Sequence, residues 1–310
     1  MILLCGIRSE PPLAMVAKAL AKLEIPCRMV HQRDVAGYRI QWRIDAGEVT
    51  GTLALGDEEI DLASVEGVYM RLMDDRILPE LEGLPDDDPA RRHARAFHEA
   101  LLRWSEVAPA RVVNRAGPQG SNSSKPLQAQ LIAAHGFLPP PTLITNDPEA
   151  VLAFREKHGR LIYKSISGIR SIVAFLEDGD LERLERIRWC PVQFQKAIDG
   201  VNVRVHVIGS SAYATEIQST HVDYRYAKRN GGETRLKATT LPRAVRTSCI
   251  ALARDLGLDF AGIDLMRTEG GEFYCFEVNP QPAFSYFEAN TGQPIARAVA
   301  RHLAGLPHRR

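Results

Sequence analysis

The chain has 310 residues, and its 39 Lys and Arg side chains nearly balance 38 Asp and Glu, which leaves a net charge of +1. This length predicts two or three subdomains rather than one small core. An apolar content of 45% with 25% charged residues excludes a wholly disordered or fibrous chain. The near-zero net charge argues against binding by bulk electrostatics, so we expect no nucleic-acid or membrane partner.

The five cysteines are scattered, odd in number and free of any C-x-x-C pair. We therefore expect neither a disulfide framework nor a zinc site, and a reducing, cytoplasmic location. The apolar residues 1–5 are followed too soon by Arg8 and Glu10 for a secretion signal. No apolar run approaches the ~18 residues that a membrane-spanning helix needs.

The first third of the chain is typical of a parallel sheet with crossing helices. We expect, in chain order, a strand at 1–5, a helix at 13–23, a strand at 27–30, a hairpin at 47–62, a strand at 67–71, a helix at 90–104 and a strand ending at 114. The acidic run 84–89 is interpreted as a hydrated loop rather than a metal site.

The second third begins with a connector rich in Gly, Ser and Asn, residues 117–124, where we place a subdomain boundary. Pro126 is suited to the start of a helix that Ser123 or Ser124 can cap. The following elements are expected to be a helix to about 135, a strand at 142–145, a helix at 148–159, and paired strands at 161–164 and 172–176.

In the last third, residues 201–207 alternate strictly, so the valines share one face while Arg204 and His206 share the other. A three-residue loop to the next strand, 212–218, places Arg204 opposite Glu216. This register keeps the polar set away from the core. An amphipathic helix and a final hairpin are expected to follow, at 243–256 and 261–279.

The final hairpin has residues 270–271, two glycines, as its predicted two-residue turn. This turn places Asp264 directly across from Glu277 on one face. On the other face it places Leu265 across from Phe276, an apolar pair. The register thus separates an acidic face from an apolar face.

Two opposed carboxylates destabilise a sheet unless something lies between them. Asn279 shares the face of Asp264 and Glu277, and three oxygen ligands without His or Cys suit magnesium. The pattern therefore predicts a magnesium site that completes its coordination with phosphates. The alternative is an exposed sheet face on which one carboxylate pairs with Lys or Arg.

Two lysines are candidate phosphate ligands. Lys164 ends an apolar strand, where a buried ammonium is costly unless an anion meets it, and Lys125 begins a helix. The Ser- and Gly-containing loop after Lys164, with Arg170 as a further cation, could cover a triphosphate. A lysine at a helix start is more often a solvated surface residue, so both gain weight only beside the acidic hairpin.

These motifs resemble those of the ATP-grasp superfamily, in its RimK-type and glutathione-synthetase-like branch of carboxylate–amine ligases. The resemblance rests on the order of Lys125, Lys164, the run 195–198, Arg204, Asp264 and the run 277–280. Further runs are similar to the macrocyclising ligases of graspetide (microviridin-type) peptides, namely 68–71, 113–114, 142–147, 203–205 and 223–225.

The resemblance implies an α/β (α+β) ATP-grasp fold. A pre-ATP-grasp parallel-sheet domain would occupy residues 1–116, and two α+β subdomains that grip the nucleotide would occupy 117–193 and 194–310. Two departures are visible: the loop after Lys164 is poorer in glycine than in relatives, and Lys196 replaces their acidic hinge residue.

The resemblance also implies roles for individual residues. Nucleotide contacts would come from Lys125 and Lys164 on the phosphates, Arg170 in the covering loop, Gln195, the backbone of Lys196 and Ile198 on adenine, and Asp199 near the ribose. Two magnesium ions would be held by Asp264, Glu277 and Asn279. Arg204 would stabilise the transferred phosphoryl group, and Arg225 would act on the acceptor side.

The function implied is ATP-dependent ligation, in which a substrate carboxylate becomes an acyl phosphate and then reacts with an amine or hydroxyl. A ribosomal precursor peptide is a substrate that the graspetide resemblance implies. A phosphotransferase and a non-catalytic nucleotide-binding module are the alternatives. His206 is a candidate base or a structural histidine. Arg8, Arg71 and the aromatic segment 282–292 either line the acceptor side or only pack. A homodimer is a common arrangement that the sequence does not decide.

Overall fold

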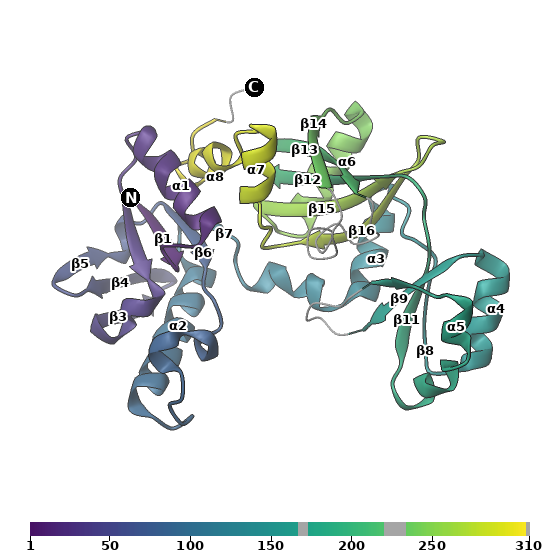
Figure 1. Ribbon diagram of the computed structural model, residues 1–310. Coiled ribbons are helices and arrows are strands. Elements are labelled where there is room, and N and C mark those ends of the chain that lie inside the picture. Colours follow the sequence, from purple (N-terminus) through teal and green to yellow (C-terminus); the bar gives the residue numbers. More distant parts are fainter. Residues whose placement is uncertain (167–172, 220–233, 308–310) are drawn as a thin grey trace.

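The computed structural model describes residues 1–166, 173–219 and 234–307. Within these residues the strands form four sheets. Figure 1 shows them as an N-terminal lobe in purple and blue, a central sheet in teal, and a C-terminal sheet in green and yellow. None of the described helices combines the length and apolarity that crossing a bilayer requires.

The N-terminal lobe contains the predicted parallel sheet, in the order β2-β1-β6-β7. Its strands are β1 (Ile2–Gly6), β2 (Cys27–His31), β6 (Gly67–Arg71) and β7 (Arg111–Val113). Alternate strand residues pack on α1 (Pro11–Lys22) on one face and on α2 (Pro89–Val107) on the other. Both faces are therefore covered, as parallel sheets require.

A second, antiparallel sheet of the N-terminal lobe has the order β3-β4-β5. The predicted hairpin is formed by β4 (Glu48–Leu55) and β5 (Glu58–Asp61), but β3 (Tyr38–Asp45) was not predicted. The inward side chains of β3 include Tyr38 and Trp42, whose indole Nε1 donates to the Ala100 carbonyl of α2. The small sheet thus covers the outer side of α2.

The central sheet is antiparallel, in the order β10-β9-β11-β8. Its strands are β8 (Thr142–Thr145), β9 (Leu161–Ser165), β10 (Ala174–Phe175) and β11 (Val192–Lys196). One face packs on α4 (Pro148–His158) and α5 (Asp178–Leu181) through Leu161 and Phe194. The opposite face carries Lys164 and Gln193, which are register partners.

The C-terminal sheet has the order β14-β13-β12-β15-β16. Its strands are β12 (Val201–Ile208), β13 (Ser211–Ser219), β14 (Thr234–Thr239), β15 (Phe260–Arg267) and β16 (Phe273–Asn279). One face packs on α6 (Arg243–Asp255), and the other on α7 (Ser285–Thr291) and α8 (Ile295–Leu303). α8 also packs on α1, so a helix from the beginning of the chain and one from near its end lie side by side (Figure 1).

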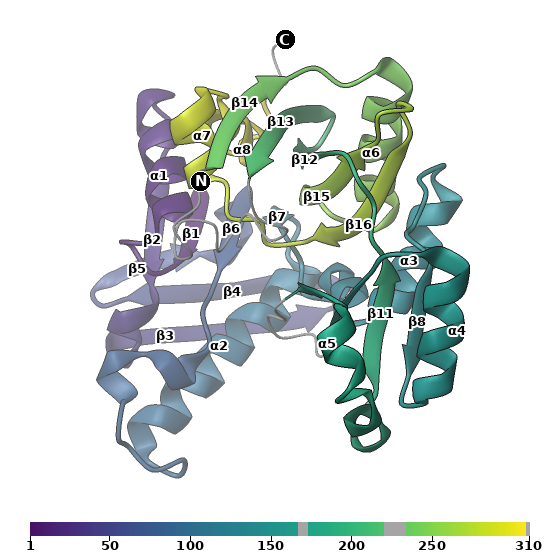
Figure 2. The ribbon, with the colours of Figure 1, turned by 45° about the vertical axis from the view of Figure 1, so that its right-hand side comes forward.

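Short 3-10 helices connect these elements at Gln32–Gly37, Leu62–Ser64, Asp75–Ile77, Pro79–Leu81, Gly117–Ser123 and Leu184–Trp189. The predicted connector rich in Gly, Ser and Asn is a 3-10 helix that is followed directly by α3 (Lys125–Ala134). Ser124 is the N-cap residue of α3, but its side chain makes no capping hydrogen bond, so that part of the prediction is wrong. Figures 1 and 2 both show α3 beside β16.

The predicted register between β12 and β13 is wrong by one residue. The turn has two residues, Gly209 with φ 51° and Ser210, so Arg204 lies opposite Thr215 rather than Glu216. The prediction assumed that the polar face meets solvent, yet Arg204 is 5% exposed and His206 is 0% exposed. Because both faces of β12 are covered, the hydrophobic pattern could not select the register.

The predicted register of the final hairpin is correct where it matters for charge and wrong beyond it. Asp264 lies opposite Glu277, as predicted. A β-bulge then shifts the pairing, so Leu265 faces Cys275 instead of Phe276, and the turn is longer than two residues. The bulge places the smaller Cys275, 1% exposed, in the core.

Asn114 connects the N-terminal lobe with the C-terminal sheet. Its side-chain amide donates to the carbonyl oxygens of Phe260 (2.6 Å) and Pro280 (2.5 Å). Its Oδ1 accepts from the Phe260 N–H at 3.0 Å. The buried Asn114 thus holds β7 against the beginning of β15 and the end of β16, next to the acidic hairpin.

Candidate active site at the edge of the C-terminal sheet

A row of charged side chains crosses three neighbouring strands of the C-terminal sheet. Arg204 of β12 lies opposite Asp264 of β15, which lies opposite Glu277 of β16. Opposed residues of antiparallel strands share a face, so the three side chains lie together. Arg204 Nη1 donates to Asp264 Oδ1 at 2.7 Å. We call these three residues the charged row.

Helix α3 adds a cation to the charged row. Lys125 Nζ donates to Glu277 Oε2 at 2.7 Å. One turn later, Gln128 anchors the helix, because its amide donates to the Val278 carbonyl (2.8 Å) and accepts from the Val278 N–H (2.9 Å). Residues three apart share a helix face, so the anchor at Gln128 holds Lys125 over Glu277.

Lys164 reaches the same place from the central sheet. It is the register partner of Gln193, on the face of the sheet opposite α4. Burial raises the pKa of the Glu277 carboxyl, but Lys125, Lys164 and Arg204 outweigh this effect and lower the pKa. The lysine of the central sheet therefore acts electrostatically on the carboxylate of the C-terminal sheet, and Glu277 stays ionised at neutral pH.

The balance of charge favours an anionic ligand. Asp264 pairs with Arg204 and Glu277 pairs with Lys125, which is the arrangement expected of the simpler alternative, an ion-paired sheet face. With Lys164 added, three cations meet two carboxylates. The side chains of Asp264 and Glu277 remain 27% and 25% exposed. A ligand can therefore reach them.

The oxygen atoms near the charged row fit a hard cation. Asn279 follows Glu277 on β16, and its Oδ1 accepts from the Gln281 N–H at 2.8 Å, which orients the amide. Two carboxylates and an amide oxygen are the ligand types that magnesium prefers. The described residues contain no group of three or more His, Cys, Asp or Glu suited to a metal. A metal here would complete its shell with water or phosphate.

The predicted adenine segment lies where β11 leaves the central sheet. The Lys196 N–H donates to the Pro141 carbonyl at 2.9 Å, so this group is already used. The Gln195 side chain is buried and donates to Thr142 Oγ1 at 2.9 Å. The Asp199 side chain is 86% exposed and paired with Arg160. The segment through Ile198 joins the central sheet to β12, as a hinge would.

His206 lies deep in the C-terminal sheet. It is 0% exposed, and its ring packs edge-on against Phe287, with 4.9 Å between centroids, and near Phe260. Burial and the charge of Arg204 hold its pKa well below the ordinary value, and the backbone of Ala283 opposes them only in part. A neutral, enclosed ring favours the structural alternative over a base that meets substrate.

Arg71 of the N-terminal lobe forms a closed ion pair. Its Nε donates to both carboxylate oxygens of Glu10 at 2.9 Å, and only 10% of its side chain is exposed. Its guanidinium also lies 5.9 Å from the ring centre of Tyr69. Arg8 is exposed in the loop after β1. The structure brings neither arginine into the charged row.

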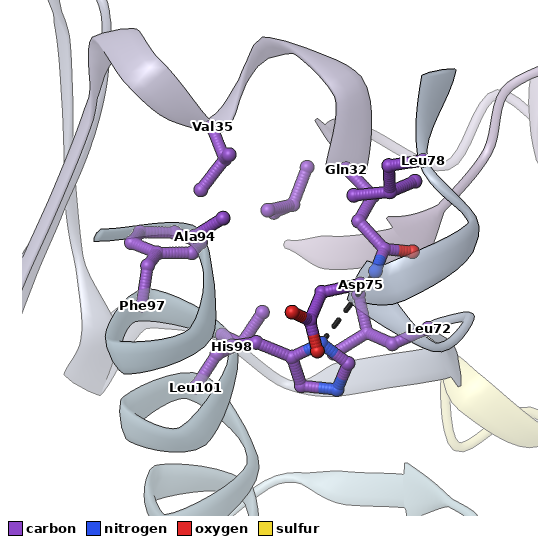
Figure 3. A pocket seen from close by; sticks show the side chains of 10 residues that line it. Gln32, Val35, Leu72, Asp75, Leu78, Ala94, Phe97, His98 and Leu101 are labelled. Carbon is purple, nitrogen blue, oxygen red and sulfur yellow. Dashed lines mark hydrogen bonds between the residues drawn. The ribbon is translucent and has the colours of Figure 1, made fainter. Parts of the chain in front are cut away.

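The N-terminal lobe also encloses a small cavity of about 10 Å³ between α2 and the parallel sheet. Figure 3 shows its largely apolar wall, with Phe97 and Leu101 of α2. Its polar members are Asp75, Gln32 and His98, and the dashed line joins Gln32 Nε2 to His98 Nδ1 at 3.5 Å. This volume suits one water molecule and is no nucleotide site.

Two predicted site residues, Arg170 and Arg225, lie outside the described residues. Two buried glutamines beside the predicted site were not singled out from the sequence, Gln128 next to Val278 and Gln193 next to Lys164. A buried polar residue three positions after a helix-start lysine was the available signal for Gln128. Gln193 required strand β11, which was not predicted.

The comparison with protein families agrees with this geometry. The model of the RimK-like ATP-grasp domain matches residues 122–303, more than half of the chain. The chain belongs to the RimK-like ATP-grasp family. The matched range contains the charged row and both lysines, so the family predicted from the motifs is confirmed.

Relatives of this family include proteins named probable alpha-L-glutamate ligase. One from Parasynechococcus marenigrum is 25% identical over 286 residues, which are 84% of this chain and 58% of that protein. One from Pseudomonas paraeruginosa is 26% identical over 222 residues, 67% of this chain and 73% of that protein. The chain thus spans less than two thirds of the length of the first relative.

Solved structures of ATP-grasp ligases share the fold over nearly the whole chain. The macrocyclase MdnC of Microcystis aeruginosa, bound to precursor peptide MdnA, has a TM-score of 0.77 at 22% identity and covers 98% of this chain and 99% of its own. A RiPP-associated ligase of Chryseobacterium gregarium, with ADP and peptides, has a TM-score of 0.80 at 22% identity and covers 99% of this chain and 97% of its own. The ligase PsnB, with minimal precursor, Mg and ADP, has a TM-score of 0.75 at 27% identity and covers 98% of this chain and 96% of its own. The predicted ATP-grasp fold is therefore confirmed.

Proposed function

We propose that this protein is an ATP-dependent ligase that activates a carboxylate as an acyl phosphate and joins it to an amine or hydroxyl. The observation that carries the proposal is the convergence of Lys125, Lys164 and Arg204 on Asp264 and Glu277. These five residues come from separate elements of two sheets and one helix. Structural ion pairs need only two partners, whereas this cluster suits a polyphosphate.

The residues divide the work by position. Lys125 and Lys164 bind phosphate oxygens as compact point charges. Arg204 stands on the sheet face beside Asp264 and stabilises negative charge as the phosphoryl group is transferred. The backbone of Lys196 and Ile198 binds adenine on the hinge, and the neighbouring Gln195 is also assigned to nucleotide binding. Asp199, Arg170 and Arg225 keep their proposed places at the ribose, in the covering loop and on the acceptor side.

Magnesium fits the charged row because its donors are all oxygen. Asp264, Glu277 and Asn279 would hold it, and two ions are proposed. When bound, magnesium neutralises charge on the phosphates. Binding requires Glu277 to exchange its contact with Lys125, which frees that ammonium group for a phosphate oxygen. Glu277 thus holds the ammonium group of Lys125 in place until the nucleotide binds.

The proposed substrate is a side-chain carboxylate of a precursor peptide. The support is that MdnC, PsnB and the Chryseobacterium ligase, which share the fold, were solved with such peptides. Addition of glutamate, as the names of the other relatives suggest, would use the same acyl phosphate. We further propose action in the reducing cytoplasm, in keeping with five free cysteines. A homodimer stays a prediction.

Oxygen transfer tests the proposal. A carboxylate oxygen attacks the γ-phosphorus of ATP and ADP leaves, and the nucleophile then displaces phosphate from the carbonyl carbon. One oxygen therefore moves from the carboxylate into phosphate. We expect that ¹⁸O-labelled carboxylates, in a Glu- and Asp-rich precursor peptide or in L-glutamate supplied as the carboxylate donor, yield phosphate with one ¹⁸O atom.

Other outcomes overturn the proposal. Phosphate recovered on a hydroxyl of the acceptor, with unlabelled free phosphate, would show a phosphotransferase. Binding of ATP without formation of ADP in the presence of any of the acceptors would show a non-catalytic nucleotide-binding module.

A further inference from the structure

Gly262 lies beside the charged row in the middle of β15. It pairs with Asn279 of β16 and with His206 of β12. Its φ angle is not in the left-handed region, so the backbone does not require glycine here. Glycine in the interior of a strand weakens the strand and often marks a place where another group comes close. The expected reason for a glycine at position 262 is therefore that another group lies close to β15 there.

The space above Gly262 is filled by the guanidinium of Arg204. A Cβ atom on Gly262 would lie 2.1 Å from Arg204 Nη2 and 2.5 Å from Cζ. Real Cβ atoms essentially never come within 3.0 Å of such an atom. The guanidinium thus lies across β15, with Nη1 on Asp264 and Nη2 over Gly262.

The guanidinium has little room to move aside. The same Cβ atom would lie 2.7 Å from Cβ of Pro282, a buried residue of the loop after β16. Asp264 occupies one side, and the enclosed ring of His206 is close enough for Arg204 to lower its pKa. The side chain of Arg204 is only 6% exposed. A methyl group at position 262 would therefore have to displace the guanidinium.

We propose that Gly262 is a positioning residue for Arg204. The glycine lets the guanidinium lie flat across β15, where it faces the transferred phosphoryl group. The inference rests on the proposed function, because it assigns Gly262 a part in the work of Arg204. It adds a residue that touches neither nucleotide nor metal and acts only through the arginine.

The test is a double-mutant cycle with Gly262→Ala, Arg204→Ala and the double variant. Displacing one charge-stabilising group costs about 10²-fold in kcat. We expect Gly262→Ala to lower kcat by about this factor, with KM for ATP changed less than ~3-fold, in phosphate release with the peptide of the isotope experiment. We expect the double variant to be no slower than Arg204→Ala alone, since Gly262 acts through that side chain.

Thermal melting gives a second readout that needs no substrate. Removing the guanidinium relieves the closest contact, so Gly262→Ala should lower the melting temperature less in an Arg204→Ala background than in the native protein. This comparison holds even where the single variant folds poorly. In an Arg204→Lys background, which lacks the planar fork, Gly262→Ala should cost less than in the native protein.

The outcomes separate the two claims. Native turnover in Arg204→Ala would remove the proposed role of the arginine and, with it, the role of Gly262. Loss of turnover in Arg204→Ala with native turnover in Gly262→Ala would overturn only the positioning role. An equal loss of melting temperature on Gly262→Ala in the native and Arg204→Ala backgrounds, or a double variant far slower than Arg204→Ala, would show that Gly262 serves general packing.

Discussion

Buried arginine–carboxylate pairs occur in both lobes, but they differ in their surroundings. In the N-terminal lobe Arg71 and Glu10 satisfy each other, and the pair closes on itself. In the C-terminal sheet the Arg204–Asp264 pair lies against Glu277, and lysines from two other elements join it. A single buried pair shows little about function. Convergence of several charges from separate elements is the stronger sign of a ligand site.

The largest expected effect is on catalysis, where substitutions in the charged row should act and substitutions in the Arg71–Glu10 pair should not. Glu277→Gln keeps the shape but removes the charge that we assign to the metal, so ATP-dependent product formation should fall by about 10³-fold. Lys164→Ala should cause a similar loss. Phosphate release and mass spectrometry of the product measure both. Glu10→Gln is the matched control in the other lobe and should keep turnover per folded molecule. Native turnover in Glu277→Gln would contradict the assignment.

The second expected effect is on the stability of the N-terminal lobe, through the Arg71–Glu10 pair. Arg71→Ala leaves the Glu10 carboxylate partly buried without its partner, so the free energy of unfolding should fall by about 2–3 kcal/mol. Urea denaturation measures this. Turnover of the remaining folded protein should be close to native. A stable variant that has lost turnover would instead place Arg71 at the acceptor, the other role that the sequence left open.

A smaller effect is expected at the anchor of α3. Gln128→Met keeps the length of the side chain but leaves the N–H and carbonyl of Val278 without partners, which should cost about 2 kcal/mol. Lys125 would then be held less firmly over Glu277, so KM for ATP should rise. Gln130→Met, the same substitution at an exposed position of α3, is the control and should cost little. Equal loss in both variants would argue against the reciprocal hydrogen bonds.

The smallest effect is a pH dependence away from the site. The pKa of His135 is raised, first by the Leu131 carbonyl and then by Asp255, which joins the end of α3 to α6. Protonated His135 therefore stabilises the fold below pH 6.5, and this stabilisation is lost as the pH rises through the raised pKa. The change should stay below ~1 kcal/mol. Asp255→Asn should reduce it in thermal melts while the part due to the Leu131 carbonyl remains, and an unchanged profile would contradict the pair.

The sequence predicted the acidic pair of the site from the two-glycine turn and the apolar pairing of the final hairpin. Asp264 and Glu277 had to share a face for the apolar residues to share the other, and the structure confirms that pairing. The bulge at Leu265 was invisible, since it depends on how Cys275 fills the core. Alternation predicted strand β12 but not its register, because a strand covered on both faces hides its polar side chains.

The remaining differences between the sequence-based predictions and the structure arise from contacts between segments that are distant in the sequence. The alternation of β12 did not show that His206 is enclosed by the rings of Phe260 and Phe287, because these residues lie on other elements. The reciprocal bonds of Gln128 to β16 join residues 150 positions apart. Strand β3 needs α2 to cover its inner face. Such features follow from tertiary packing, which local patterns do not carry.

The most direct test of the account is the effect of magnesium on nucleotide binding. Calorimetry with the non-hydrolysable analogue AMPPNP should show at least ~10-fold tighter binding with magnesium than with EDTA in the native protein, about 1.4 kcal/mol. Asp264→Asn and Glu277→Gln should lose this gain, and Glu10→Gln should keep it. An equal affinity with and without magnesium, or a gain that survives both substitutions, would contradict the assignment of the charged row.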